Sequence, residues 1–430
     1  MVEIRGGKPG LHDIQRHLRN TAQHHLRTRP GHAQRLNDTS IKDRTMNFGF
    51  SEDQIMIANS AKGFVANESD LDRIRGYRET DEYYSEELYA KMAENGWIGA
   101  VIPEEYGGVD LGYVDLICIM EAFGVGLMPE PILSSQILGG NTILQAGTEE
   151  QMQEWLPKIS EGAAKLTLAC YELAGRYNLT HVETTASPND DGYLLKGTKA
   201  MVTDASSADR IIVSARTSGD TDSADGISLF LVDPLASGVS LDEVNTMDHQ
   251  SYSTLTLDNA TGELLGSAGG ALSAIEDSVD KINVGLCAEM VGGMAESLRL
   301  TVEYTQERVQ FDRVIGSFQA VKHKAADMYL KLEAARSNMY LAAMAIDNDL
   351  PETRKAVSSA KAMCSDNYNA VAKEAIQLHG GIGYTDEHVM HFYYKRAQAV
   401  GTTFGDAMYH RERYMVEMAK LADAPVPAGV

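Results

Sequence analysis

The chain is poor in several features that would assign it to other classes of protein. No apolar run among its 430 residues approaches the length of a membrane span. Its four cysteines, at positions 118, 170, 287 and 364, form no CxxC pair, which fits a reduced, cytoplasmic setting without a structural zinc site. Cationic residues are scarce, because 38 Lys and Arg stand against 61 Asp and Glu. The net charge of −23 argues against a nucleic-acid partner.

The first 45 residues differ in composition from the rest of the chain. They hold nine Lys or Arg against four Asp or Glu and show no apolar periodicity. We interpret residues 1–45 as a disordered upstream extension. An organellar transit peptide is the alternative, since the segment is rich in Arg and poor in acids, but its prolines, glycines and several acids disfavour a cleavable amphipathic helix.

The spacing of apolar residues divides the remainder into three predicted domains. Residues 46–165 have helical spacing, and Ser51 with Gln54 forms a capping-box pattern before the first helix. Residues 166–267 hold β-branched and alternating runs between turn formers, which predicts a small antiparallel, barrel-like β-domain. Residues 268–430 return to long helices with wide apolar faces, which are typical of a four-helix bundle. We therefore expect an α+β protein.

The most informative segment is residues 307–319, where one long helical run ends and another begins after a short loop. It contains Arg308, Phe311 and Gln319. A guanidinium can bind pyrophosphate in bidentate fashion, and an aromatic ring can cover a flat heterocycle. Taken alone, the segment is more typical of a helix hairpin that has a solvated, charged tip.

Four motifs in the same order resemble the acyl-CoA dehydrogenase family. Residues 97–108 resemble its GW…PEEYGG run, residues 155–162 its WLP…G run, residues 307–319 its FAD-binding element and residues 377–383 its Q..GG.G loop. The resemblance covers roughly residues 46–415. It implies the family's order of domains and an enzyme that oxidises an acyl-CoA thioester to the 2-enoyl-CoA with FAD, in fatty acid or steroid catabolism.

The resemblance also implies which residues hold FAD. Arg308 matches the pyrophosphate arginine, Phe311 the aromatic residue beside it, and Gln319 the glutamine that follows. These three residues are therefore expected to contact the adenosine diphosphate half of the cofactor.

A second group of matches lies further along the chain and in the β-domain. Gln377, Gly380 and Gly381 match a loop at the same half of FAD, where glycines let the backbone approach phosphate closely. Thr203 matches the threonine beside flavin N5, although Met201 replaces the family's tryptophan. In the family these groups reach across a subunit interface, which implies at least a dimer.

The main departure from the family pattern concerns the catalytic base, which is usually a glutamate before a glycine near the C-terminus. Alignment puts Phe404 there, and phenylalanine cannot accept a proton. The place that other members use, on the first long C-terminal helix, is Ile282. Asp406 lies two residues after Phe404, and Asp280 lies two residues before Ile282, so these two acids are the candidate bases. Glu289 lies two helical turns after Ile282 and is the next nearest acid. Asp406 also suits a helix N-cap.

Three interpretations of this departure stay open. In the first, Asp406 or Asp280 acts as the base from a shifted position. In the second, the chain is the non-catalytic half of a heteromeric enzyme whose partner supplies the base. In the third, the chain is an inactive FAD-binding or assembly subunit. We favour the second narrowly, because residues 176–178 and 288–293 resemble small subunits encoded in bacterial catabolic clusters.

The resemblance also indicates partners. It implies an acyl-CoA substrate, an electron-transfer flavoprotein as acceptor, and either a homo-oligomer or a paired acyl-CoA dehydrogenase subunit. No metal is expected, because no carboxylate or Cys completes a ligand spacing with His388 and His391.

Overall fold

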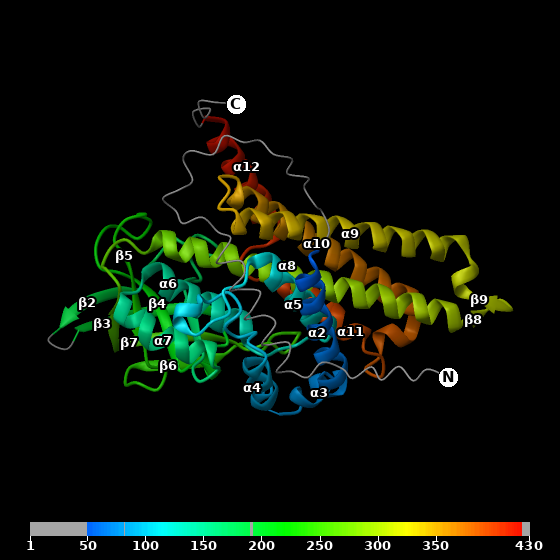
Figure 1. Ribbon diagram of the computed structural model, residues 1–430, viewed down its shortest axis with the longest axis horizontal. Coiled ribbons are helices and arrows are strands. Elements are labelled where there is room, and N and C mark those ends of the chain that lie inside the picture. Colours follow the sequence, from blue (N-terminus) through cyan, green and yellow to red (C-terminus); the bar gives the residue numbers. More distant parts are fainter. Residues whose placement is uncertain (1–49, 81, 190–191, 424–430) are drawn as a thin grey trace, which may run out of the picture.

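The computed structural model describes residues 50–80, 82–189 and 192–423 (Figure 1). The extension expected over residues 1–45 lies outside these ranges. Within the described ranges, no helix combines the length and the apolar character needed to cross a membrane.

The N-terminal part is helical, as its apolar spacing predicts. Ser51 Oγ accepts the N–H of Gln54 at 3.1 Å, and Gln54 Oε1 accepts the N–H of Ser51 at 3.0 Å, so the predicted capping box is confirmed. The elements are α2 (Glu52–Glu68), α3 (Leu71–Tyr77), α4 (Glu86–Glu94), η2 (Glu104–Tyr106), α5 (Tyr113–Val125), the π-helical η3 (Ser134–Asn141), α6 (Thr142–Ala146) and α7 (Glu149–Ser160).

A seven-stranded sheet follows. Its strands are β1 (Leu166–Ala169), β2 (Thr185–Asn189), β3 (Gly192–Thr203), β4 (Arg210–Arg216), β5 (Ile227–Val232), β6 (Val239–Glu243) and β7 (Tyr252–Leu265), with η4 (Ala205–Ser207) after β3. The path β4–β2–β3–β7–β5 returns to β4, so the sheet closes into a barrel. The predicted β-domain is confirmed, but its sheet is mixed rather than purely antiparallel. β1 runs parallel to β4, because the chain between them crosses over through β2 and β3.

A buried ion pair ties the segment after β1 to the barrel. Lys199 Nζ on β3 lies 2.6 Å from Glu172 Oε1 and 3.0 Å from Ser214 Oγ. Glu172 also accepts the N–H groups of Glu183 and Thr184, at 2.6 and 3.0 Å. Burial acts to raise the pKa of Glu172, yet the charge of Lys199 and these hydrogen bonds hold it below its usual value. The carboxylate is therefore ionised and fully engaged.

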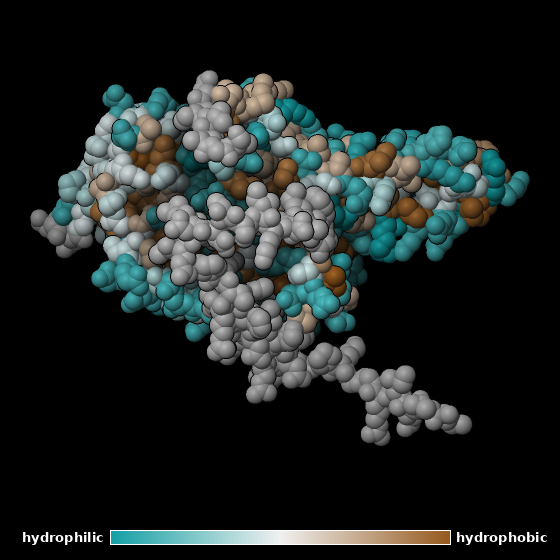
Figure 2. All heavy atoms as spheres, turned by 45° about the horizontal axis from the view of Figure 1, so that its top comes forward, coloured by the Kyte–Doolittle hydropathy of each residue, from teal (hydrophilic) through white to brown (hydrophobic). Residues whose placement is uncertain are grey.

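Long helices make up the C-terminal part, and this confirms the predicted helical bundle. They are α8 (Leu272–Glu307), α9 (Gln319–Asp347), α10 (Thr353–His379), α11 (Met390–Val400) and α12 (Ala407–Asp423), with η5 (Ile315–Ser317), η6 (Gly380–Tyr384) and the strands β8 (Val309–Gln310) and β9 (Arg313–Val314). α8, α9 and α10 run together away from the β-domain, and the β8–β9 hairpin lies at the far end (Figure 1). Hydrophobic residues lie among hydrophilic ones on this projecting part (Figure 2).

Replacing Lys199 with Met is expected to lower the free energy of unfolding by roughly 3–5 kcal/mol, because Glu172 would stay buried without its counter-charge. The double variant Lys199→Met with Glu172→Leu should recover part of this loss. Urea unfolding at neutral pH measures both values. Lys420→Met serves as the control, since it removes a side chain that is 61% exposed and paired with Glu417, and it should cost less than about 1 kcal/mol. Equal losses in the two single variants would contradict the prediction.

Candidate functional site

A cavity of about 410 Å³, called the main cavity below, lies between the β-domain and the segment after α11. Its volume is in the range of small-molecule sites. The lining side chains that bear on function are Tyr171, Met201, Thr203, Tyr252 and Phe404. The structure thus brings Thr203, the predicted flavin contact, to the same cavity as Phe404, the residue in the usual place of the base.

A bulge in β3 directs Thr203 toward this cavity. The register between β3 and β7 shifts between Lys199 and Val202, and Met201 in the extra position adopts a left-handed backbone with φ 52°. The carbonyl of Thr203 accepts a hydrogen bond from Thr167 Oγ1 at 2.8 Å. The hydroxyl of Thr203 is buried and has no hydrogen-bond partner in the described part of the chain. A buried donor at a cavity wall without a partner fits contact with a polar ligand such as a flavin.

The segment that carries Phe404 is held on three sides. Phe404 is 7% exposed and has a left-handed backbone with φ 54°. Its carbonyl oxygen accepts from Asn283 Nδ2 at 3.3 Å and from His410 Nε2 at 3.1 Å, and the carbonyl of Gly405 accepts from Lys361 Nζ at 2.9 Å. Burial lowers the pKa of Lys361 to about 8 and that of His410 to about 3. These contacts fix the ring of Phe404 at the wall of the cavity.

Asp406, one of the two candidate bases, immediately precedes α12. Its Oδ1 accepts the N–H of Tyr409 at 2.8 Å, the geometry of an N-cap. Asp406 does not line the main cavity. It lines a neighbouring groove of about 580 Å³, called the α12 groove, to which Arg176, Tyr177 and Arg413 also contribute.

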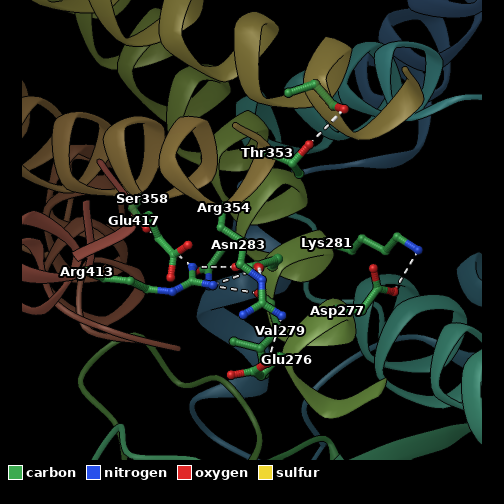
Figure 3. A network of polar contacts seen from close by, with 12 residues as sticks. Glu276, Asp277, Val279, Lys281, Asn283, Thr353, Arg354, Ser358, Arg413 and Glu417 are labelled. Atoms are coloured by element: carbon green, nitrogen blue, oxygen red, sulfur yellow. Dashed lines mark hydrogen bonds and ion pairs between the residues drawn. The ribbon is translucent and has the colours of Figure 1, made fainter. Parts of the chain in front are cut away.

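Asp280, the other candidate, is 4% exposed and bound by arginines. Its two carboxylate oxygens lie 2.5 and 2.8 Å from the two terminal nitrogens of Arg413, and Arg354 Nε is 3.8 Å away. Burial raises the pKa of Asp280, against the opposing charge of Arg413. Figure 3 shows Arg413 and Arg354 converging on α8 near Glu276. Asp280 borders a separate groove of about 990 Å³ rather than the main cavity.

Glu289, the third acid near the expected places, is also engaged. Its carboxylate binds Arg396 at 2.5 and 2.9 Å, and Arg396 binds Asp248 at 2.8 Å. Each carboxylate proposed from the sequence therefore already has a structural partner.

Sequence reasoning missed two polar groups at the site. Asp204 accepts from Ser134 Oγ at 2.5 Å and lines a small inner cavity of about 50 Å³ together with Thr203 and Phe404. Burial raises the pKa of Asp204 to about 6. Tyr171, the second group, lines the main cavity, and its hydroxyl is buried without a partner among the described residues. The sequence signal that could have indicated Asp204 is its position next to Thr203.

The predicted adenosine diphosphate contacts gather at the far end of α8. The ring of Tyr304 on α8 stacks on His379 at the end of α10, with centroids 4.6 Å apart. This stack brings Arg308, which follows α8, near Gly380 and Gly381, which follow α10. Gln377 lies in the last turn of α10, and Gln319 is the first residue of α9.

Backbone and charge at this end fit a phosphate group. The side chain of Arg308 is exposed and forms no ion pair with any described residue. Gly380 has φ 64°, and a Cβ on either Gly380 or Gly381 would meet nothing within 4 Å, so the backbone is open to a ligand. Phe311, in the two-residue turn between β8 and β9, is 85% exposed.

The two groups of predicted contacts do not meet within one chain. Asn283 holds the segment at the main cavity, and Arg308 follows the last residue of the same helix. A helix rises about 1.5 Å per residue, so roughly 38 Å separate these two positions. Contact of one cofactor with both Arg308 and Thr203 would therefore require groups from two chains, as the resemblance implies.

Comparison with known proteins gives matches over the described length. The N-terminal, middle and C-terminal domains of acyl-CoA dehydrogenase match residues 51–163, 167–260 and 272–418. The caffeyl-CoA reductase–Etf complex subunit CarC of Acetobacterium woodii is 31% identical over 360 residues, which cover 80% of this chain and 93% of that protein.

Two solved structures are also similar. A variant of the Tcur3481–Tcur3483 steroid ACAD has a TM-score of 0.78 at 30% identity, over 87% of this chain and 99% of that one. The FAD complex of PigA has a TM-score of 0.81 at 25% identity, over 87% of this chain and 99% of that one. Together with the unpartnered hydroxyl of Thr203 and the open glycines beside Arg308, these matches confirm the expected cofactor. The chain belongs to the acyl-CoA dehydrogenase family of flavoprotein oxidoreductases, and its cofactor is FAD.

Proposed function

We propose that this chain catalyses hydride transfer at the Cα–Cβ bond of an acyl-CoA thioester, the reaction that the resemblance describes as α,β-dehydrogenation. The observation that carries the proposal is the main cavity, where the unpartnered hydroxyl of Thr203 lies beside the fixed segment of Phe404. FAD, when bound, takes the hydride in dehydrogenation and gives it in the reverse reaction.

We propose that the FAD site is shared between two chains. One chain supplies Arg308, Phe311, Gln319, Gln377, Gly380 and Gly381, and the other supplies Thr203. The exposed guanidinium of Arg308 would bind pyrophosphate, and the exposed ring of Phe311 would be covered on assembly. The second chain is either a copy of this one or a paired acyl-CoA dehydrogenase subunit. The two-part name of the similar steroid ACAD supports the paired arrangement.

We further propose that the CoA ester enters through the α12 groove. This groove shares Arg176 and Tyr177 with the main cavity, so the two form a continuous approach. Arg176 is exposed in this groove and forms no ion pair with a described residue, so it offers positive charge to an anionic CoA ester. Arg413 is paired with Asp280, and the acids Glu276, Asp406 and Glu412 also line the groove. An electron-transfer flavoprotein is the proposed redox partner, and the name of the caffeyl-CoA reductase–Etf complex subunit supports it.

We propose that neither Asp406 nor Asp280 is the base. Asp406 caps α12, and Asp280 forms a bidentate pair with Arg413. In the main cavity, Glu172 is bound by Lys199, and Phe404 is apolar. No described residue that lines the main cavity has a free carboxylate. This observation favours the second candidate function, an FAD-binding or assembly subunit without activity.

Replacing Arg308 with Ala is expected to weaken FAD binding by about 10- to 100-fold, because charged hydrogen bonds are worth about 1.5–3 kcal/mol each. Flavin absorbance per chain after gel filtration and titration of the apoprotein with FAD measure the effect. Arg299→Ala is the matched control, since this exposed arginine on α8 pairs only with Glu296 and Glu303, and its FAD content should equal that of the wild type. Full FAD retention by Arg308→Ala would contradict the proposal that Arg308 binds the pyrophosphate of FAD.

Replacing Asp406 with Asn should leave turnover close to that of the wild type, because Asn caps a helix about as well as Asp. Asp406→Ala should lose about 0.5–2 kcal/mol of stability while the folded fraction keeps its rate. Steady-state kinetics with acyl-CoA esters and thermal unfolding separate the two effects. A fall of about 10²-fold or more in Asp406→Asn would instead identify a general base.

A further inference from the structure

Asp204 places a carboxylate next to the proposed flavin contact. It follows Thr203 directly, and both residues line the inner cavity together with Phe404. Ser134 Oγ donates to Oδ2 of Asp204 at 2.5 Å, and no cationic side chain in the described part of the chain forms an ion pair with it. Asp204 is half-buried rather than sealed in the core, so its carboxylate can exchange a proton.

The nearest cation is already committed to other acids. Arg396 lines the same cavity, and its guanidinium binds Glu289 at 2.5 and 2.9 Å and Asp248 at 2.8 Å. One arginine with two carboxylates has a net charge of −1, so this group offers Asp204 no surplus positive charge. An ionised Asp204 therefore adds a second uncompensated negative charge beside the place of the flavin ring.

The other titratable groups around Asp204 come from several elements and differ from it in state. The charged groups are already in ion pairs, and the tyrosines are kept neutral because burial raises the pKa of each. Burial also raises the pKa of Asp204 to about 6, against the hydrogen bond from Ser134. Asp204 thus changes its charge near neutral pH. The surrounding groups are Tyr84, Tyr89 on α4, Glu130 with its partner Arg73, Tyr252 on β7, Glu289 on α8, and Arg396 on α11 with its partner Asp248.

Resting on the proposed function, in which the flavin ring lies beside Thr203, we infer that Asp204 takes up a proton when FAD is reduced. Consecutive Cα atoms are about 3.8 Å apart, so a ring in contact with Thr203 lies on the order of 10 Å or less from this carboxylate. Negative charge added at that distance raises the proton affinity of the carboxylate about tenfold. The coupling is reciprocal, so a proton on Asp204 makes the reduction of FAD more favourable.

The step balances in atoms and charge. Two electrons pass to FAD from a reductant, which is the acyl-CoA ester in the proposed dehydrogenation. One proton from the solvent binds to the carboxylate of Asp204, where an O–H bond forms, and it returns to the solvent when FAD is reoxidised. The inner cavity has room for a water molecule at about 50 Å³, and it shares Thr203, Tyr252, Thr403 and Phe404 with the main cavity, which gives the proton a path.

The test measures the midpoint potential of the bound FAD against pH, in the purified FAD-loaded protein and without any thioester. Dithionite is the reductant, and a dye of known potential is the reference. Below pH 6, Asp204 is protonated in both oxidation states, so the wild type and Asp204→Asn should have the same potential. Above it, the wild-type potential should fall below that of Asp204→Asn and level off about 30 mV lower, the equivalent of a tenfold change in proton affinity for a two-electron couple.

Two further variants separate this role from a structural one. Ser134→Ala removes the hydrogen bond that favours the ionised form of Asp204, so the bend in the wild-type curve should move to higher pH. Asp209→Asn is the matched control, because it makes the same change of charge at an exposed aspartate that lines neither cavity. Its curve should follow that of the wild type. Asn tolerates the left-handed backbone of Asp204, with φ 54°, as Asp does.

The outcomes separate this inference from the proposed function. Curves of the wild type and Asp204→Asn that coincide, or that differ by the same amount at every pH, overturn the role of Asp204 and leave the proposed hydride transfer standing. A bend that stays in place in Ser134→Ala, or an equal effect of Asp209→Asn, also overturns it. An FAD-loaded wild type that shows the predicted bend but reacts with no acyl-CoA or enoyl-CoA ester overturns the proposed function and supports the inference.

Discussion

The length and burial of α8 constrain the rest of the structure. This helix of 36 residues packs against α5, α9 and α10, and most of its first two thirds is buried. One end carries Asp280 and Asn283 beside the segment of Phe404, and the other end leads to Arg308. Because a helix cannot bend its ends together, the two groups of residues that we propose to hold FAD lie at opposite ends of one chain. The proposal that two chains share the FAD site rests on the length of this one helix.

Three buried carboxylates near the site are each paired with a cation. Glu172 binds Lys199, Asp280 binds Arg413, and Glu289 binds Arg396. Removing one partner of such a pair costs about 3–5 kcal/mol, so none of these carboxylates is readily released for catalysis. Phe404 adds an apolar wall where a carboxylate is usual. The hydroxyls of Thr203 and Tyr171, two residues that line the main cavity, are buried and have no hydrogen-bond partner among the described residues.

Local charge, rather than net charge, decides which ligands this acidic protein attracts. The chain has a net charge of −23, and the α12 groove carries both signs of charge, because Glu276, Asp406 and Glu412 line it together with two arginines. Arg176 and Arg413 line the α12 groove, and Arg308 is exposed beyond α8. Exposed charges more than about 8–10 Å apart are largely screened at physiological salt, so an anionic ligand responds chiefly to the charges next to its own site rather than to the net charge of the chain.

The sequence by itself determined the types of element and the family. Apolar spacing predicted the helical parts, Ser51 with Gln54 predicted the first cap, and Phe404 indicated an altered base, because these signals are local. The tertiary structure alone decided which acids are engaged. Asp280 and Arg413 lie 133 positions apart in the sequence, and the bulge at Met201 depends on its pairing with β7. Likewise, the burial of Asp204 and the missing partner of Tyr171 depend on contacts between residues distant in the chain, and a pattern of neighbours cannot encode them.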